Sequence, residues 1–166
     1  MSNSKVLLFL LFLLFTMSCS KEQPTTQNIK KKTQELEMIE AYKDGLEKLN
    51  INDTYNAAQK FLEAELLFPQ SSWAPKSALM ASYAYYLQNY YSEALSNLER
   101  YLKIYPKDKG VSYAHYLIGI CYYEMIEDEK RDIEPLLKAK NKFEFLMENY
   151  PNTSLLKLIH LRLNLV

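Results

Sequence analysis

The stretch SYAYYLQNYYSEALSNLERYLKIYP, residues 82–106, contains the spacing that decides the fold. Small Ser82 is followed twelve positions later by Ala94. Leu98 comes four positions after that alanine, and Pro106 comes twelve positions after it. Apolar residues recur at helical spacing on both sides of a short break. Proline ends the second run because it lacks a backbone donor and disfavours helix in the preceding residue. The stretch therefore predicts a hairpin of two helices.

The same spacing occurs before and after this stretch. The first set is Gly45, Ala57, Phe61 and Pro69, and the third is Gly119, Ala139, Phe143 and Pro151. In the third set twenty positions separate the glycine from the alanine, and the last two spacings are kept. The small positions recur every 37 residues. A small residue facing an alanine lets paired helices approach closely, and the bulky residue wedges into the groove toward the next repeat. This spacing is typical of tetratricopeptide repeats, which must stack to bury a core.

We therefore predict an all-α fold, an α-solenoid of about three and a half tetratricopeptide-type hairpins. The repeat domain is expected at residues 35–166, with hairpins at about 35–69, 74–106 and 110–151 and a partial fourth at 153–166. The expected helices are Thr33–Leu49, Asp53–Leu67, Ala74–Gln88, Tyr91–Tyr105, Lys109–Glu127 and Pro135–Asn149. The extra residues of the third hairpin fall around residues 125–135. Their run of mixed charges, 127–132, predicts a solvated segment rather than a metal site.

The beginning of the chain predicts export and a lipid anchor. Lys5 precedes an apolar run, residues 6–17, which as a helix reaches about 18 Å against about 30 Å of membrane hydrocarbon. Residues 1–18 are therefore predicted to be a signal peptide. Ser18-Cys19 resembles the lipobox of bacterial lipoproteins, whose cysteine is acylated, although Thr16 stands where leucine is usual. Ordinary cleavage near Ser18 is the alternative. A flexible tether is expected over residues 19–34.

The end of the chain is unusually apolar. Continuing the repeat places Asn164 at the small position of a fourth hairpin, within the leucine-rich residues 153–166. Since natural solenoids end in a polar capping helix, this pattern favours a truncated chain or a helix that needs a partner. The alternative is that the segment caps the third hairpin with its leucines buried.

Composition excludes several classes of function. The formal net charge is +0, with 20 basic and 20 acidic residues, so the basic surface that nucleic acids require is missing. The two histidines, His115 and His160, belong to no catalytic motif, and no phosphate loop occurs. Cys121 lies in an apolar helical pattern and is predicted to be a small buried apolar residue. We predict no catalysis, no cofactor, no metal and no small-molecule substrate.

Tyrosine is the most unusual component. The chain has 14 tyrosines, all between residues 42 and 150. The first helices of stacked hairpins line the concave side of a solenoid, and tyrosine suits protein-binding surfaces as well as helix packing. The candidate groove for a peptide or partner is Tyr42, Lys76, Leu79, Tyr83, Tyr86, Tyr113, Tyr116 and Tyr123. For each of these residues, packing between helices is the alternative interpretation.

Several features together resemble the BamD family, the lipoproteins of the outer-membrane β-barrel assembly machine. These features are the lipobox, the tether, Ala84-Tyr85-Tyr86, Tyr105-Pro106, the enlarged third hairpin with residues 132–135, and residues 150–154. The resemblance covers about residues 38–160 and matches roughly the first three and a half of the five repeats usual in that family.

The resemblance implies a lipid-anchored protein of the outer membrane that faces the periplasm and binds other proteins. It implies barrel-assembly subunits and unfolded outer-membrane protein precursors as partners, with the precursors meeting the groove of the first repeats. Docking to the machine's central subunit is a property of the last repeats in that family. The alternative function is a tetratricopeptide lipoprotein serving pilus assembly or cell-wall coordination.

Overall fold

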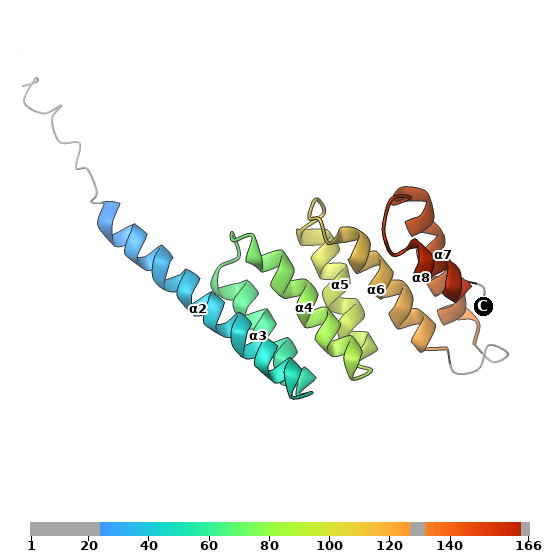
Figure 1. Cartoon of the computed structure of the whole chain (residues 1–166), viewed down its shortest axis with the longest axis horizontal. Helices are drawn as coiled ribbons and strands as arrows, with labels where there is room; N and C mark the ends of the chain where they lie inside the picture. Colours follow the sequence, from blue (N-terminus) through green and yellow to red (C-terminus); the bar gives the residue numbers. More distant parts are fainter. Residues whose placement is uncertain (1–23, 127–131, 164–166) are drawn as a thin grey trace, which may run out of the picture. The chain divides into compact units, whose positions relative to one another are not determined.

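The computed structural model describes residues 24–126 and 132–163, which form helices and short connections without a strand (Figure 1). The helices are α2 (Pro24–Asn50), α3 (Thr54–Leu67), α4 (Trp73–Leu87), α5 (Tyr91–Ile104), α6 (Val111–Glu124), α7 (Glu134–Asn149) and α8 (Leu156–Leu163). The predicted signal peptide and Cys19 lie outside the described residues. Among the described helices, none combines the length and the hydrophobicity that a membrane crossing requires.

The chain divides into two units after Lys32. Of the first unit, the described residues 24–32 are the start of α2. The second unit contains the rest of α2 with α3, then the pairs α4–α5 and α6–α7, and finally α8. From α3 onward each helix packs against the next, and α4 also contacts α6. The all-α solenoid of helical hairpins predicted from the spacing is confirmed.

The residues of the repeat pattern form the contacts inside each hairpin. A Cβ atom added at Gly45 would lie 2.8 Å from Cε1 of Phe61, and one added at Gly119 would lie 2.6 Å from Cε1 of Phe143. The alanines and the bulky residues of all three sets are fully buried. Each phenylalanine ring thus lies directly on the glycine of its own hairpin, where we had expected it to point toward the next repeat. Ring and glycine together set the close spacing of the two helices.

The hydrophobic core forms two clusters of buried side chains. The larger cluster joins the first two hairpins to α6, and includes Met38, Phe61, Tyr101 and Leu117. The smaller cluster joins the third hairpin to α8, and consists of Ile120, Ala139, Phe143, Leu146 and Ile159. Partly buried tyrosines, Tyr86 among them, pack against both clusters. The stacked hairpins therefore share one continuous apolar interior, as repeat proteins require.

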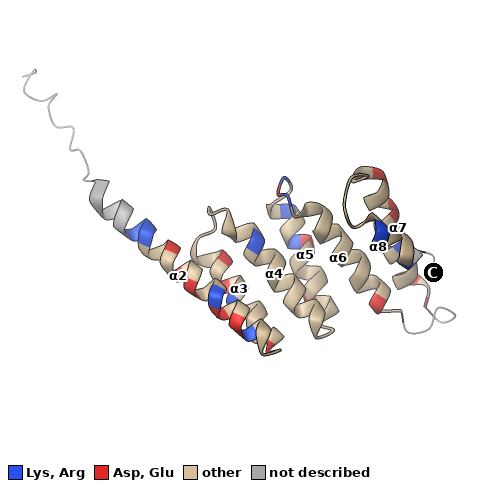
Figure 2. Cartoon of the chain, viewed as in Figure 1, with Lys and Arg blue, Asp and Glu red and all other residues tan. Residues whose placement is uncertain are grey.

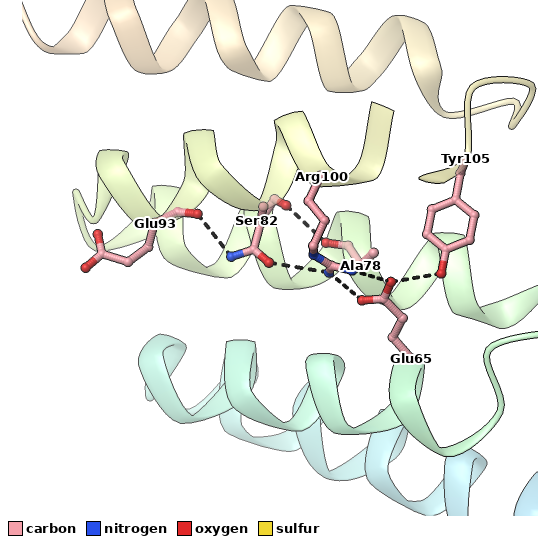
Figure 3. A network of polar contacts seen from close by, with 7 residues as sticks. Glu65, Ala78, Ser82, Glu93, Arg100 and Tyr105 are labelled. Atoms are coloured by element: carbon pink, nitrogen blue, oxygen red, sulfur yellow. Dashed lines mark hydrogen bonds and ion pairs between the residues drawn. The ribbon is translucent and has the colours of Figure 1, made fainter. Parts of the chain in front are cut away.

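An ion pair with a buried carboxylate ties the first hairpin to the second (Figure 3). The Glu65 side chain on α3 is only 4% exposed and accepts two hydrogen bonds from the Arg100 guanidinium on α5, at 2.8 and 2.5 Å. The Tyr105 hydroxyl donates a third hydrogen bond to Glu65, at 2.8 Å. Because both carboxylate oxygens are paired, the buried charge is compensated.

The turns of the first two hairpins share one backbone feature. Asn52 and Asn89, which are 37 positions apart, have φ angles of 62° and 63°. Asparagine tolerates this left-handed conformation better than most residues do. In addition, the Gln88 amide donates to the Asn52 carbonyl at 3.2 Å, which links the two turns. The third hairpin has a longer connection, residues 125–133, at the predicted place, although residues 127–131 of its charged run lie outside the described residues.

The chain departs from the expected tether. We had predicted a flexible segment to residue 34, whereas α2 begins at Pro24 and includes residues 24–34. This segment has few apolar residues, so it shows no helical hydrophobic period. Its glutamine and lysine residues nevertheless have good helix propensity, and proline is favoured in the first turn of a helix.

The last described helix lies against the third hairpin on one side only. Ile159 is fully buried there, whereas Leu158 is 47% exposed and Leu161 is 60% exposed. Part of the segment thus covers the third hairpin, as the capping alternative requires, while two leucines remain exposed. Asn164 lies outside the described residues.

Candidate partner-binding surface

The two central first helices, α4 and α6, carry almost no charge. Lys76 is the single charged residue of α4, and Glu124 is the single charged residue of α6. The long helix α2 carries many charges of both signs, so the contrast is plain along the ribbon (Figure 2). A partner that meets α4 and α6 therefore meets mainly uncharged side chains.

Four predicted site residues lie together on these helices, and we call them the tyrosine face. They are Tyr83 and Tyr86 on α4, with ring centroids 6.3 Å apart, and Tyr113 and Tyr116 on α6, with centroids 6.2 Å apart. All four are half-buried. Burial, followed by the neighbouring hydroxyls of Tyr83, Tyr116 and Tyr86, raises the pKa of Tyr113 to about 12. The structure thus brings together residues from two successive hairpins.

The hydroxyl groups of the tyrosine face have no hydrogen-bond partner within the described part of the chain. Other tyrosines do have one: Tyr85 accepts from Gln59 at 2.6 Å, and Tyr101 donates to Asp108 at 2.5 Å. Over residues 24–126 and 132–163, the buried side-chain polar atoms without a partner are Thr54 Oγ1, Ser77 Oγ and His115 Nδ1, and none belongs to the tyrosine face. Its hydroxyls therefore reach solvent, where they can donate to or accept from a bound chain.

Two other predicted site residues lie in a separate cluster. Tyr42 is 6% exposed, with its ring centroid 5.2 Å from that of Phe61 and 5.1 Å from that of Trp73. The Lys76 ammonium lies 4.5 Å from the centroid of Trp73 and 5.1 Å from that of Tyr42. Tyr42 therefore packs mainly inside the molecule, and Lys76 makes cation–π contacts at its edge. The sequence pattern did not place Trp73 over Tyr42, because that contact depends on how two hairpins stack.

The last two predicted residues, Leu79 and Tyr123, lie on the same two helices, α4 and α6. Leu79 is half-buried against the start of α6, where a Cβ added at Gly110 would lie 2.8 Å from Leu79 Cδ2. Tyr123 lies beneath the Arg162 guanidinium of α8, at 4.9 Å from ring centroid to Cζ. Arg162 also pairs with Glu124 at 3.0 Å. Sequence reasoning missed Arg162, although its place on the helix after the third hairpin could have indicated it.

The histidine and cysteine of α6 belong to the interior. The His115 ring packs against Phe145, with centroids 4.7 Å apart, and burial, followed by the charge of Lys142, lowers its pKa to about 4. Cys121 is fully buried with a free thiol, and burial, followed by the charge of Glu124, raises its pKa to about 12. Both groups are therefore neutral near pH 7, and Cys121 is the inert thiol that its apolar neighbours predicted.

Stacked helical hairpins with a half-buried face of hydroxyl-bearing aromatic residues define a tetratricopeptide-type repeat protein. Comparison with known families agrees with this class. The chain belongs to the family described as "YfiO: Outer membrane lipoprotein", whose model matches residues 34–165.

Three relatives are each named "Outer membrane protein assembly factor BamD". The chain is 34% identical to the Caulobacter vibrioides protein over 125 residues, which cover 75% of this chain and 41% of the relative. It is 29% identical to the Rickettsia prowazekii protein over 68% of this chain and 45% of the relative. It is 26% identical to the Neisseria gonorrhoeae protein over 90% of this chain and 60% of the relative. The chain thus spans about half the length of these relatives, and the resemblance to the BamD family is confirmed.

Proposed function

We propose that this chain is a periplasm-facing lipoprotein of the outer membrane that takes part in assembling β-barrel proteins there. It acts by binding polypeptides and carries out no reaction. Family membership and the names of the relatives support this function over pilus assembly or cell-wall coordination. Because the chain spans about half of each relative, the proposal concerns the repeats that it matches.

The tyrosine face is the observation that carries the proposal. Its four rings offer apolar area, and their hydroxyls offer hydrogen-bonding groups without a protein partner. An extended polypeptide exposes backbone N–H and C=O groups together with alternating apolar side chains. The tyrosine face can hydrogen-bond to the backbone groups and pack against the apolar side chains. Because α4 and α6 carry little charge, the face is expected to bind peptides of either net charge. The partners proposed are unfolded outer-membrane protein precursors and subunits of the assembly machine.

Peptide binding by the tyrosine face can be tested by fluorescence anisotropy. The probe is a labelled peptide with the sequence of the last strand of an outer-membrane β-barrel protein. Substituting both Tyr83 and Tyr116 with alanine should weaken binding by roughly tenfold or more, because aromatic anchors dominate such interfaces. The matched control is Tyr55→Ala, which removes a half-exposed tyrosine of α3 outside the tyrosine face. Unchanged affinity in the double variant would contradict the assignment.

The lipid anchor is a separate part of the proposal and rests on Ser18-Cys19. Acyl chains on Cys19 would hold the protein at the membrane, since each buried CH₂ contributes about 0.8 kcal/mol. Metabolic labelling with a radioactive fatty acid should mark the native chain and leave Cys19→Ala unlabelled. Equal labelling of both chains would show that the acylated residue is elsewhere, and no labelling of either would favour ordinary cleavage near Ser18.

A further inference from the structure

A pocket of about 320 Å³ opens where the turn of the second hairpin meets the end of α6. Its lining includes the side chains Asn89, Tyr90, Tyr91, Glu93, Glu124 and Met125. The pocket lies next to the tyrosine face, since the ring centroids of Tyr86 and Tyr91 are 6.2 Å apart. No sequence pattern indicated it, because its two sides come from different hairpins.

The charge of the pocket is negative. Glu93 and Glu124 both line it, and no basic residue does. Within the described ranges Glu93 forms no ion pair, whereas Glu124 pairs with Arg162 and keeps 35% of its side chain exposed. Burial, followed by the charge of Glu124, raises the pKa of Tyr91, which is consistent with a carboxylate close to that ring.

The aromatic walls of the pocket are held in place by neighbouring groups. The Tyr91 hydroxyl donates to Asn89 Oδ1 at 2.8 Å. The Tyr90 ring lies 5.6 Å from Tyr55 and 6.5 Å from Tyr85, measured between centroids. Rings fixed in this way need little ordering on binding, so a ligand that stacks on them loses less free energy to conformational entropy.

A contact of Glu124 with a residue outside the pocket lining indicates which ligand suits this combination of groups. There the Arg162 guanidinium pairs with the Glu124 carboxylate and lies over the Tyr123 ring. The pocket adds the carboxylate of Glu93 and the rings of Tyr90 and Tyr91 to Glu124, and its lining includes no basic side chain. A guanidinium is planar, permanently charged and able both to stack on aromatic rings and to pair with carboxylates.

We propose that this pocket binds a cationic side chain of a partner polypeptide, with arginine preferred over lysine. The site is independent of peptide binding on the tyrosine face, and its test uses no barrel peptide. A metal ion is a poor alternative ligand, because the described residues include no group of three or more histidine, cysteine or acidic side chains placed to hold one.

The test follows the methyl group of Met125 by NMR in the full chain, purified in detergent and labelled with ¹³C at the methionine methyl groups. Met125 lines the pocket, and Met125→Leu assigns its signal. The probe is N-acetyl-arginine amide, and the matched neutral probe is N-acetyl-citrulline amide, which has nearly the same shape. The arginine probe should shift the Met125 signal to saturation, and the citrulline probe should shift it little.

Two variants separate the pocket from general attraction to acidic residues. Glu93→Gln removes one pocket carboxylate and should raise the dissociation constant of the arginine probe by about three- to fivefold, as expected for a partly exposed ion pair. Glu99→Gln removes an exposed carboxylate elsewhere on the same helix and should leave the constant unchanged. The proposal is overturned if the Met125 signal does not move, if citrulline shifts it equally, or if Glu93→Gln titrates like the native chain.

Discussion

Gly119 is a position where one added carbon meets a fully buried ring. A Cβ there would lie 2.6 Å from Cε1 and 2.9 Å from Cδ1 of Phe143, and that ring is fully buried. Overpacking of this kind costs about 1–3 kcal/mol, whereas alanine gains about 1 kcal/mol of helix propensity over glycine. We expect Gly119→Ala to lower the free energy of unfolding in urea denaturation.

The double variant Gly119→Ala/Phe143→Leu identifies the cause of that loss. Leucine removes the ring that meets the new methyl group, so the two substitutions together should cost less than the sum of their separate effects. Strict additivity, or a Gly119→Ala protein as stable as the native chain, would show that the helices separate without strain.

The ion pair between Glu65 and Arg100 should stabilise the chain more than the ion pair between Arg162 and Glu124. Arg100→Met leaves the Glu65 carboxylate buried with Tyr105 as its remaining partner, which should cost about 3 kcal/mol of unfolding free energy. Arg162→Met breaks the more exposed pair with Glu124 and should cost less than about 1 kcal/mol. Similar losses in the two variants, measured by urea denaturation, would contradict the role assigned to burial.

His115 links stability to pH. Its pKa in the folded chain is lowered to about 4, below the ordinary value of 6.5, so the unfolded chain binds the proton more readily. The stability that neutral, buried His115 contributes is therefore present above about pH 6.5 and is lost as pH falls toward 4. The urea midpoint of His115→Phe should fall less than that of the native chain over this interval. The control is His160→Gln, which removes a histidine at an exposed site.

At the scale of elements, the turns explain how the hairpins close. Asn52 has a φ of 62°, a conformation that costs an ordinary residue about 1–2 kcal/mol. Asn52→Ala should therefore destabilise the chain by about 1 kcal/mol, while Asn52→Gly, which adopts positive φ freely, should have little effect. Thermal unfolding distinguishes the two variants, and equal losses would indicate that the asparagine side chain, not the backbone conformation, is required.

The boundaries of most helices could be predicted because prolines and apolar periods mark them. The prediction of Asp53–Leu67 is within one residue of α3, and Pro135–Asn149 is within one residue of α7. The beginning of α2 could not be predicted in this way, because residues 24–34 show no apolar period. The left-handed turns at Asn52 and Asn89 were also missed, although their spacing of 37 residues was present in the sequence.

The candidate site was only partly predictable for a different reason. Spacing identified tyrosines on the first helices, but it could not separate buried Tyr42 from half-buried Tyr83. That distinction depends on Trp73, which comes from the neighbouring hairpin. Arg162 and the pocket beside Glu124 also arise between successive hairpins. The spacing of apolar residues indicates which face of a helix is buried. It does not indicate contacts between hairpins, which depend on how the hairpins stack.

At the scale of the whole molecule, the low charge of α4 and α6 predicts how binding responds to salt. The affinity of the tyrosine face for the labelled barrel peptide should change less than about twofold between 50 and 500 mM NaCl, because screening acts on charged groups. Anisotropy titrations at both concentrations measure this. A large loss at high salt would mean that charged helices such as α2 or α7, rather than the tyrosine face, hold the peptide.

The buried thiol of Cys121 can be used to measure local opening of the folded chain. A maleimide reagent cannot reach this sulfur while α6 stays packed, so its labelling rate measures how often the third hairpin separates from the second. Any rapid labelling of the native protein must come from Cys19, and an acylated Cys19 would leave no fast-reacting thiol at all. One alkylation time course could therefore follow both the local opening of the helices around Cys121 and the acylation state of Cys19.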